Sequence, residues 1–143
     1  MSIHQISVFL ENRSGQLAEV TALLAKEHVD IRAISIAETA DYGVARMIVN
    51  DCHKASAILL DHGDILSMTP VWAVEVPDRP SGLADLLEVL AKGNVDVEYM
   101  YSLFAGKDGH AYMILRISDE AAFAAALTGT DIKLVSAADL GLK

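Results

Sequence analysis

The chain has 143 residues, of which 52% are hydrophobic and 22% are charged, a composition that predicts a folded globular protein and excludes a disordered one. Its 20 acidic and 11 basic side chains give a formal net charge of -9, and no cluster of Lys and Arg interrupts this balance. We therefore expect it to bind neither nucleic acid nor an anionic membrane surface.

Membrane insertion and secretion are also not expected. No apolar run approaches the roughly 18 residues that a spanning helix needs, and the first residues, MSIHQIS, lack the charged and apolar regions of a signal peptide. The single cysteine, Cys52, cannot form an internal disulfide, which agrees with a reducing compartment. These features predict a cytoplasmic protein.

The first half of the chain reads as a β-α-β-β-α-β series. Residues 6–10 alternate with a period of two, as in a strand, and Leu17, Val20 and Leu24 then recur at helical spacing. The remaining expected elements are strands at 29–38 and 44–50, a helix at 53–62 and a strand at 65–69. Asp51 is expected to cap the second helix.

The second half repeats this series. A shift of 66 positions lays it on the first half without a gap for more than forty positions, with identities such as Val8/Val74 and Arg13/Arg79. The expected elements are a helix from Leu83 to Leu90, strands at 95–104 and 110–117, a helix at 120–127 and a strand at 132–136. The pair Asp108-Gly109 between the middle strands is typical of a type I′ turn.

An internal repeat of this length indicates one supersecondary unit used twice. The order predicts an α+β fold of two ferredoxin-like βαββαβ units, each an antiparallel sheet with its helices on one face. We expect domains at 1–70 and 71–143. Because residues 65–76 run nearly strand to strand with only Pro70 between them, the two units are expected to be packed together and not tethered.

A polar segment joins the first strand to the first helix in each half: residues 11–17 (ENRSGQL), here called the first corner, and residues 77–83 (PDRPSGL), the second corner. A strand, then Asn or Asp, Arg, Ser or Pro, and Gly, then a Leu-rich helix resembles the ACT domain, a regulatory module of amino-acid metabolism. The continuation AKEHVDIRAISIAETADYGVARMIV is also similar to that family. The resemblance covers almost the whole chain, as two copies without a catalytic domain.

The resemblance implies that a free amino acid binds at the interface between units, close to the corner, and that units pair side by side, which favours a homodimer. The physics of the corner agrees: the first helical turn offers unpaired N–H groups to a carboxylate, and Gly15 or Gly82 lets the backbone come close. Asn12 or Asp78 could accept the ammonium group. The second corner moves its glycine by one position and has Pro80 in place of Ser14, which can alter or abolish a site there.

The predicted ligand-binding residues come from both corners and from the strand that follows each first helix. They are Glu11, Asn12, Arg13, Ser14, Gly15, Gln16, Leu17, Ile31, Asp78, Pro80, Ser81, Gly82, Leu83, Tyr99 and Tyr101. Strand alternation puts the two tyrosines on one face. We expect no metal and no cofactor, because the single cysteine and the scattered histidines lack ligand spacing.

Simpler interpretations stay open beside these. The first corner is also typical of an ordinary turn in which Asn12 or Ser14 caps the helix and Gly15 shapes the turn. Arg13 and Arg79 are expected to be solvated or paired with a nearby carboxylate. No catalytic motif is present, so we do not expect an enzyme. The resemblance implies a regulatory protein that senses an amino acid and acts on a partner metabolic enzyme. The alternative is a structural subunit that docks onto such an enzyme without a ligand, and a weaker one is an enzyme of unknown chemistry.

Overall fold

The structure is a computed structural model and describes residues 2–11, 13–38 and 41–143. It divides the chain into two compact units, whose boundary lies between Pro70 and Val71. The N-terminal unit comprises His4–Pro70 together with Ala137–Lys143, and the C-terminal unit comprises Val71–Ser136 together with the chain start through Ile3. The boundary falls inside one strand, β4 (Leu66–Pro77), which merges the two strands expected on either side of Pro70.

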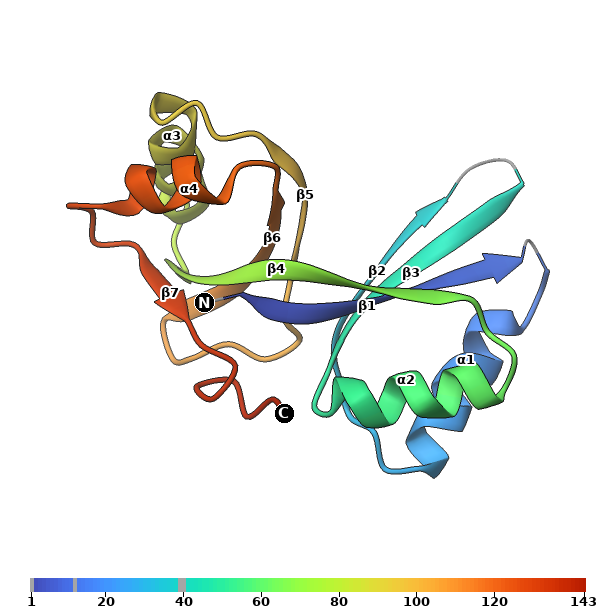
Figure 1. Ribbon diagram of the computed structural model, residues 1–143. Helices are drawn as coiled ribbons and strands as arrows, with labels where there is room; N and C mark the ends of the chain where they lie inside the picture. The colour runs from blue at the N-terminus through green and yellow to red at the C-terminus, as the bar shows by residue number, and fades with distance from the viewer. Residues whose placement is uncertain (1, 12, 39–40) are drawn as a thin grey trace. The chain divides into compact units, whose positions relative to one another are not determined.

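The N-terminal unit has the strand order β2-β3-β1-β4. Its other elements are β1 (Ile3–Glu11), α1 (Gln16–Lys26), β2 (Ile31–Glu38), β3 (Tyr42–Val49) and α2 (Cys52–Asp61). Strand β3 pairs antiparallel with both β1 and β2. Helices α1 and α2 lie on the same face of this sheet (Figure 1), which confirms the expected ferredoxin-like arrangement.

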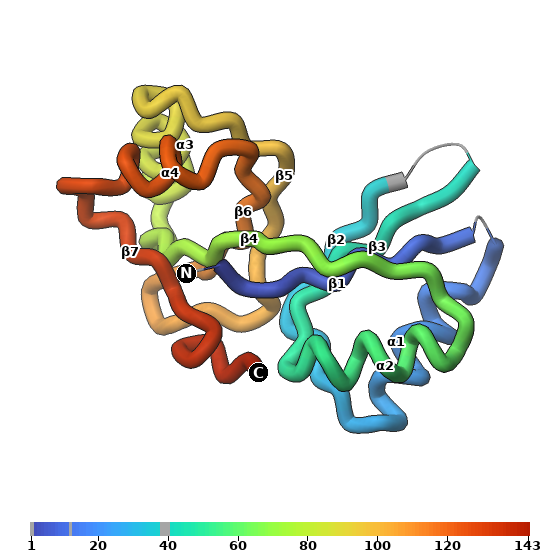
Figure 2. The backbone as a smooth tube through the Cα atoms, in the orientation of Figure 1, coloured from blue at the N-terminus to red at the C-terminus, as the bar shows by residue number. Residues whose placement is uncertain are grey.

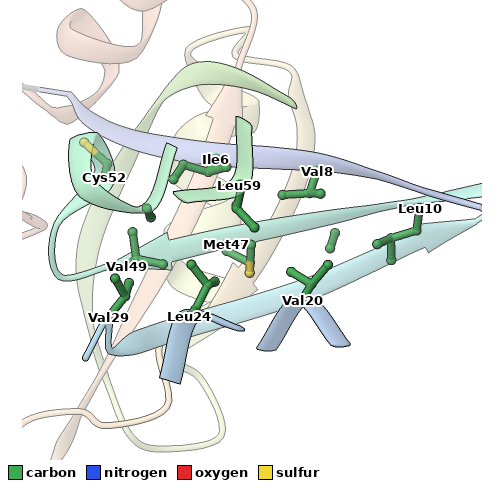
Figure 3. Close-up of a cluster of buried hydrophobic side chains, with 12 residues drawn as sticks. Ile6, Val8, Leu10, Val20, Leu24, Val29, Met47, Val49, Cys52 and Leu59 are labelled. Atoms are coloured by element: carbon green, nitrogen blue, oxygen red, sulfur yellow. The ribbon is translucent and has the colours of Figure 1, made fainter. Parts of the chain in front are cut away.

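The core of the N-terminal unit lies between the sheet and these helices. Alternation along β1 turns Ile6, Val8 and Leu10 towards the helices, and Val20 and Leu24 meet them from α1, where all five side chains are buried (Figure 3). The rest of the cluster comes from β3, α2 and the α1–β2 connection: Val29, Ala45, Met47, Val49, Cys52, Ala55 and Leu59. The period-two pattern of β1 and the helical positions Val20 and Leu24 therefore mark the core face, whereas Leu17 of the same helical pattern is exposed.

The last seven residues of the chain pack on the N-terminal unit although they follow the second repeat. Leu140 is buried, and its carbonyl oxygen accepts a hydrogen bond from Arg32 Nη1 at 3.0 Å. The Lys143 N–H donates to the Asn50 carbonyl oxygen at 2.8 Å. The sequence carries no periodic signal in this segment, and its position was not foreseen.

The C-terminal unit repeats the architecture with the strand order β5-β6-β4-β7. Its other elements are α3 (Gly82–Lys92), β5 (Val97–Ser102), β6 (His110–Ile117), α4 (Glu120–Leu127) and β7 (Lys133–Val135). All three pairings are antiparallel, and Figure 2 traces the backbone through the same succession of strands and helices in each unit. Trp72 and Phe123 anchor its core, with ring centroids 5.9 Å apart.

The expected gap-free repeat is wrong in the third strand. Ile6 faces Met47 across the N-terminal sheet, whereas Trp72, 66 positions after Ile6, faces Leu115, which is 68 positions after Met47. The β5–β6 connection is therefore two residues longer. A shift by an even number of residues keeps every side chain on its own face of the sheet. The insertion therefore leaves the pattern of core residues intact, and an alignment based on hydrophobicity does not reveal it.

The turn of this longer connection also differs from the prediction. The His110 N–H donates to the Lys107 carbonyl oxygen at 2.8 Å, which closes a four-residue turn. Gly109 has a φ of 72°, but Asp108 is not among the described residues with positive φ. A type I′ turn needs positive φ at both central residues, so the turn is of another type. The matching turn of the first half includes residues 39–40, outside the described residues.

Candidate functional site

The first corner is shaped by the φ of one glycine. Gly15 is the N-cap residue of α1, with a left-handed φ of 85°, and nothing lies within 4 Å of the position that a Cβ would take. Ser14 is therefore not the capping residue, contrary to that interpretation of the corner. Asn12, the other predicted cap and the predicted ammonium acceptor, lies outside the described residues, so its roles stay predictions.

A network of charges links the first corner to the end of α2. Arg13 Nη2 lies 3.2 Å from Glu19 Oε2, which confirms the expected carboxylate partner, and Glu19 Oε1 lies 3.2 Å from His62 Nε2. His62 Nδ1 lies 2.8 Å from Asp64 Oδ2. The hydrogen bond with Asp64, helped by the charges of Asp64 and Glu19, raises the pKa of His62 above its ordinary value of 6.5, while desolvation opposes the rise.

A small cavity of ≈70 Å³ lies beside the first corner. It is lined by Phe9, Glu11, Gln16, Gly63, Asp64 and Ile65. Gln16, the first residue of α1, is only 8% exposed. Its Oε1 is buried and has no hydrogen-bond partner among the described residues. A buried acceptor without a partner is costly, so this side chain is held inside the unit by packing.

The second corner uses its glycine differently. Ser81 is the N-cap residue of α3 and has right-handed dihedrals, with a φ of -87°. Gly82 follows as the first helical residue, and a Cβ added there would lie 2.0 Å from the Pro77 carbonyl oxygen. Arg79 donates to Ser81 Oγ at 3.0 Å and lies 3.3 Å from Asp85 Oδ2, so its expected carboxylate partner is also confirmed. The glycine here permits a close approach of helix and strand.

A larger cavity of ≈240 Å³ lies beside the second corner, within the C-terminal unit. Its lining comes from the end of β4, the corner, α3 and the α4–β7 connection: Glu75, Val76, Pro77, Arg79, Gly82, Asp85, Leu86, Val89, Thr130, Asp131 and Ile132. Of the predicted ligand-binding residues that the structure describes, only Gly82 lines it. The repeat relates part of this lining to the first half, because residues 130–132 stand 66 positions after Asp64–Leu66. Asp64 and Ile65 line the cavity beside the first corner.

The structure separates the other predicted residues from this cavity. Tyr99 and Tyr101 stack on one face of β5, with ring centroids 6.5 Å apart, which confirms their shared face but places them outside the cavity lining. Ile31 begins β2 of the N-terminal unit. Leu17 and Leu83 are exposed at the starts of their helices. A role for these residues in binding remains a prediction.

The described residues contain no group of three or more His, Cys, Asp or Glu side chains placed to hold a metal ion. None of the helices within the described residues is long and apolar enough to cross a membrane.

Comparison with known proteins gives the family. A model of the family described as "ACT domain pair" matches residues 1–140. The chain belongs to the ACT domain pair family. The ACT fold expected from the two corners is thereby confirmed, and ACT domains are regulatory modules. No curated protein sequence matches the chain significantly.

Two solved structures are similar to this chain. The crystal structure of protein BT0572 from Bacteroides thetaiotaomicron shares 38% identity with a TM-score of 0.90, covering 99% of this chain and 96% of that one. The ligand-free regulatory subunit of aspartate kinase from Thermus thermophilus shares 18% identity with a TM-score of 0.63, covering 86% and 87%. At that identity the second likeness shows a common fold alone.

Proposed function

We propose that this ACT domain pair binds a free amino acid and, through it, regulates a partner enzyme or transporter of amino-acid metabolism. The observation that carries the proposal is a cavity beside a corner in a chain of this family. A regulatory subunit of aspartate kinase, an enzyme that acts on an amino acid, has the same fold. The signal to the partner can only be as large as the ligand's difference in affinity between two conformations.

The chemistry of a corner suits an amino acid. The first turn of an 11-residue helix such as α3 presents N–H groups without helical partners and the positive end of the helix dipole to a carboxylate. Carboxylates such as Asp131 can accept an ammonium group. The cavity of ≈240 Å³ is smaller than the roughly 300–1,000 Å³ of pockets for drug-sized ligands, which favours a small metabolite.

We further propose that the protein works as a homodimer in the cytoplasm. Strands β2 and β5 end the strand orders of their units, and the unpaired N–H and C=O groups of such a strand edge can pair with another chain. Ile36 of β2 is 44% exposed, which adds apolar area to such an edge. Light scattering after size-exclusion chromatography measures the mass directly, and a monomer at micromolar concentration would contradict the dimer.

A thermal-shift screen tests the proposed function. A ligand that binds only the folded protein raises the unfolding midpoint, and at about 100 times its Kd it adds about 2.7 kcal/mol of stability. We expect a rise of several degrees with at least one of the twenty amino acids at millimolar concentration and no rise with its D-enantiomer. If none of the twenty raises the midpoint, the sensor proposal is wrong.

One observation favours the alternative of a docking subunit without a ligand. Phe9 and Tyr42 stack with ring centroids 4.8 Å apart and are 38% and 40% exposed. Phe9 alternates with the core residues Val8 and Leu10, so this pair lies on the sheet face away from the helices of its unit. A protein that shows no amino-acid response but co-purifies with a metabolic enzyme, and loses that enzyme on Phe9→Ser substitution, would support the alternative.

A further inference from the structure

The two cavities occupy equivalent places in the two units. The first is bordered by Phe9, Glu11, Gln16, Asp64 and Ile65. The residues 66 positions later border the second: Glu75, Pro77, Gly82, Thr130 and Asp131. Gly63 and Gly129, also 66 positions apart, both have positive φ, 94° and 76°. The corner walls of the two cavities can therefore be compared residue by residue. The walls after the second helix shift in register, because the Phe9 N–H donates to the Ile65 carbonyl oxygen whereas Glu75 faces Lys133, which is 68 positions after Ile65.

One difference between the walls is at the first residue of the helix. Gln16 stands there in the N-terminal unit, buried, with an Oε1 that finds no partner among the described residues. Gly82 stands there in the C-terminal unit and contributes no side chain. The cavity volumes follow this difference, ≈70 Å³ against ≈240 Å³. The first corner thus has a buried side chain where the second has none.

The open state of the second corner is fixed by the backbone. Any side chain at position 82 would begin 2.0 Å from the Pro77 carbonyl oxygen, a distance that real Cβ atoms do not tolerate. The walls beyond Gly82 are apolar, from Leu86 and Val89 of α3 and from Ile132. The charged groups of the lining are Arg79, which pairs with Asp85, Glu75, which pairs with Lys107, and Asp131. This combination suits a zwitterion with an aliphatic side chain.

We infer that the second corner alone holds the ligand, so that each chain binds one aliphatic amino acid in the C-terminal unit and none at the first corner, where the Gln16 side chain is buried. The inference rests on the proposed function and deepens it by naming the copy and the class of side chain. It departs from the expectation that the rearranged glycine weakens the second corner, because that glycine is what leaves the cavity open.

Two pairs of equivalent variants test this inference by calorimetric titration with L-alanine, L-valine, L-leucine and L-isoleucine. Val89→Phe fills the second cavity, and Leu23→Phe, 66 positions earlier on α1, is its matched control; both positions are half-buried. We expect the unaltered protein to bind one of these probes with a stoichiometry of one per chain. Val89→Phe should raise the Kd at least about ten-fold, and Leu23→Phe should leave it within about two-fold.

The second pair protects the test against a misfolded variant. Arg79 and Arg13 are both largely exposed, so Arg79→Gln and Arg13→Gln should fold, which circular dichroism checks. Only Arg79→Gln should weaken binding, by about five-fold or more, as expected for the loss of a charge-assisted hydrogen bond.

A stoichiometry of two, equal losses in both members of a pair, or full binding in Val89→Phe and Arg79→Gln would overturn this inference alone. In the thermal-shift screen with all twenty amino acids, a response confined to a non-aliphatic amino acid would overturn the choice of side chain, and no response to any of them would overturn the proposed function together with this inference.

Discussion

The two corners have similar sequences but different local structures. In the first, the glycine at position 15 supplies a left-handed φ of 85°, and the next residue, Gln16, is free to carry a side chain into the unit. In the second, the glycine stands one position later, inside the helix, and touches the strand backbone. A shift of one position thus changes which residue faces the cavity. Repeats that share a motif need not share a site.

The sharpest way to break this comparison is to replace each glycine by alanine. Gly82→Ala places a methyl group against the Pro77 carbonyl oxygen, and we expect it to lower the free energy of unfolding by about 3 kcal/mol. Gly15→Ala meets nothing within 4 Å and should cost only the strain of a left-handed alanine, about 1 kcal/mol. Urea unfolding measures both. Equal losses would show that the two glycines serve one purpose.

The helix starts offer a second contrast, of smaller size. Asp51 accepts a hydrogen bond from the Lys54 N–H at 3.1 Å, and Asp119 accepts one from the Ala122 N–H at 3.0 Å, as expected for Asp51 from the sequence. Asp51→Ala and Asp119→Ala should each cost about 1 kcal/mol. Ser81→Ala should cost much less, because Ser81 makes no side-chain cap bond to α3. The same denaturant measurement ranks the three, and a Ser81 loss as large as the others would contradict the assigned caps.

Replacing Gln16 by an apolar side chain of similar length should stabilise the protein slightly. Gln16→Met keeps a long flexible side chain but removes the buried Oε1 that has no partner among the described residues. Removing an unsatisfied acceptor should raise the free energy of unfolding by roughly 0.5–1 kcal/mol. Gln16→Ala is the control, since it empties the space and should destabilise the protein. Stabilisation by both variants would indicate that Gln16 is strained and does not fill the space usefully.

The smallest effect concerns pH and is confined to the N-terminal unit, where His62 meets Glu19 and Asp64. A histidine whose pKa is raised on folding stabilises the protein when protonated. Its contribution is therefore fully present below pH 6.5, the ordinary pKa, and is lost as pH rises through the raised value. The midpoint difference between the unaltered protein and His62→Gln should shrink towards zero as the pH rises through the raised pKa of His62. NMR titration of the imidazole gives the pKa itself, and a value below the ordinary one would refute the network.

Much of the fold follows from local pattern. The alternation of β1 and the helical spacing of Leu17, Val20 and Leu24 predict their elements correctly, and the exposed Leu17 is the exception among these apolar positions. The two-residue insertion before β6 could not be seen, because an even shift conserves the face of every side chain. The burial of Leu140 in the N-terminal unit could not be predicted either, because a contact between distant segments leaves no periodic pattern in the sequence.

The site was harder to predict than the fold for a related reason. The motif drew attention to residues next to Gly82 in sequence, whereas the cavity is completed by Thr130, Asp131 and Ile132, which the fold brings to the corner from the far side of α4. The decisive contrast between Gln16 and Gly82 was visible in the repeat. What this contrast means for the cavities depends on the burial of the Gln16 side chain and on how close the Pro77 carbonyl oxygen lies to Gly82. Both arise from tertiary packing.

The most direct test of the account is an NMR titration of the ¹⁵N-labelled protein with each of the twenty amino acids. We predict that at least one of them, with an aliphatic side chain, shifts the amide resonances of Arg79, Gly82 and Asp131 in a saturable manner. The resonances of the equivalent Arg13, Gln16 and Ile65 should move far less. Saturable shifts centred on the first corner, or none anywhere with any amino acid, would contradict the central claim.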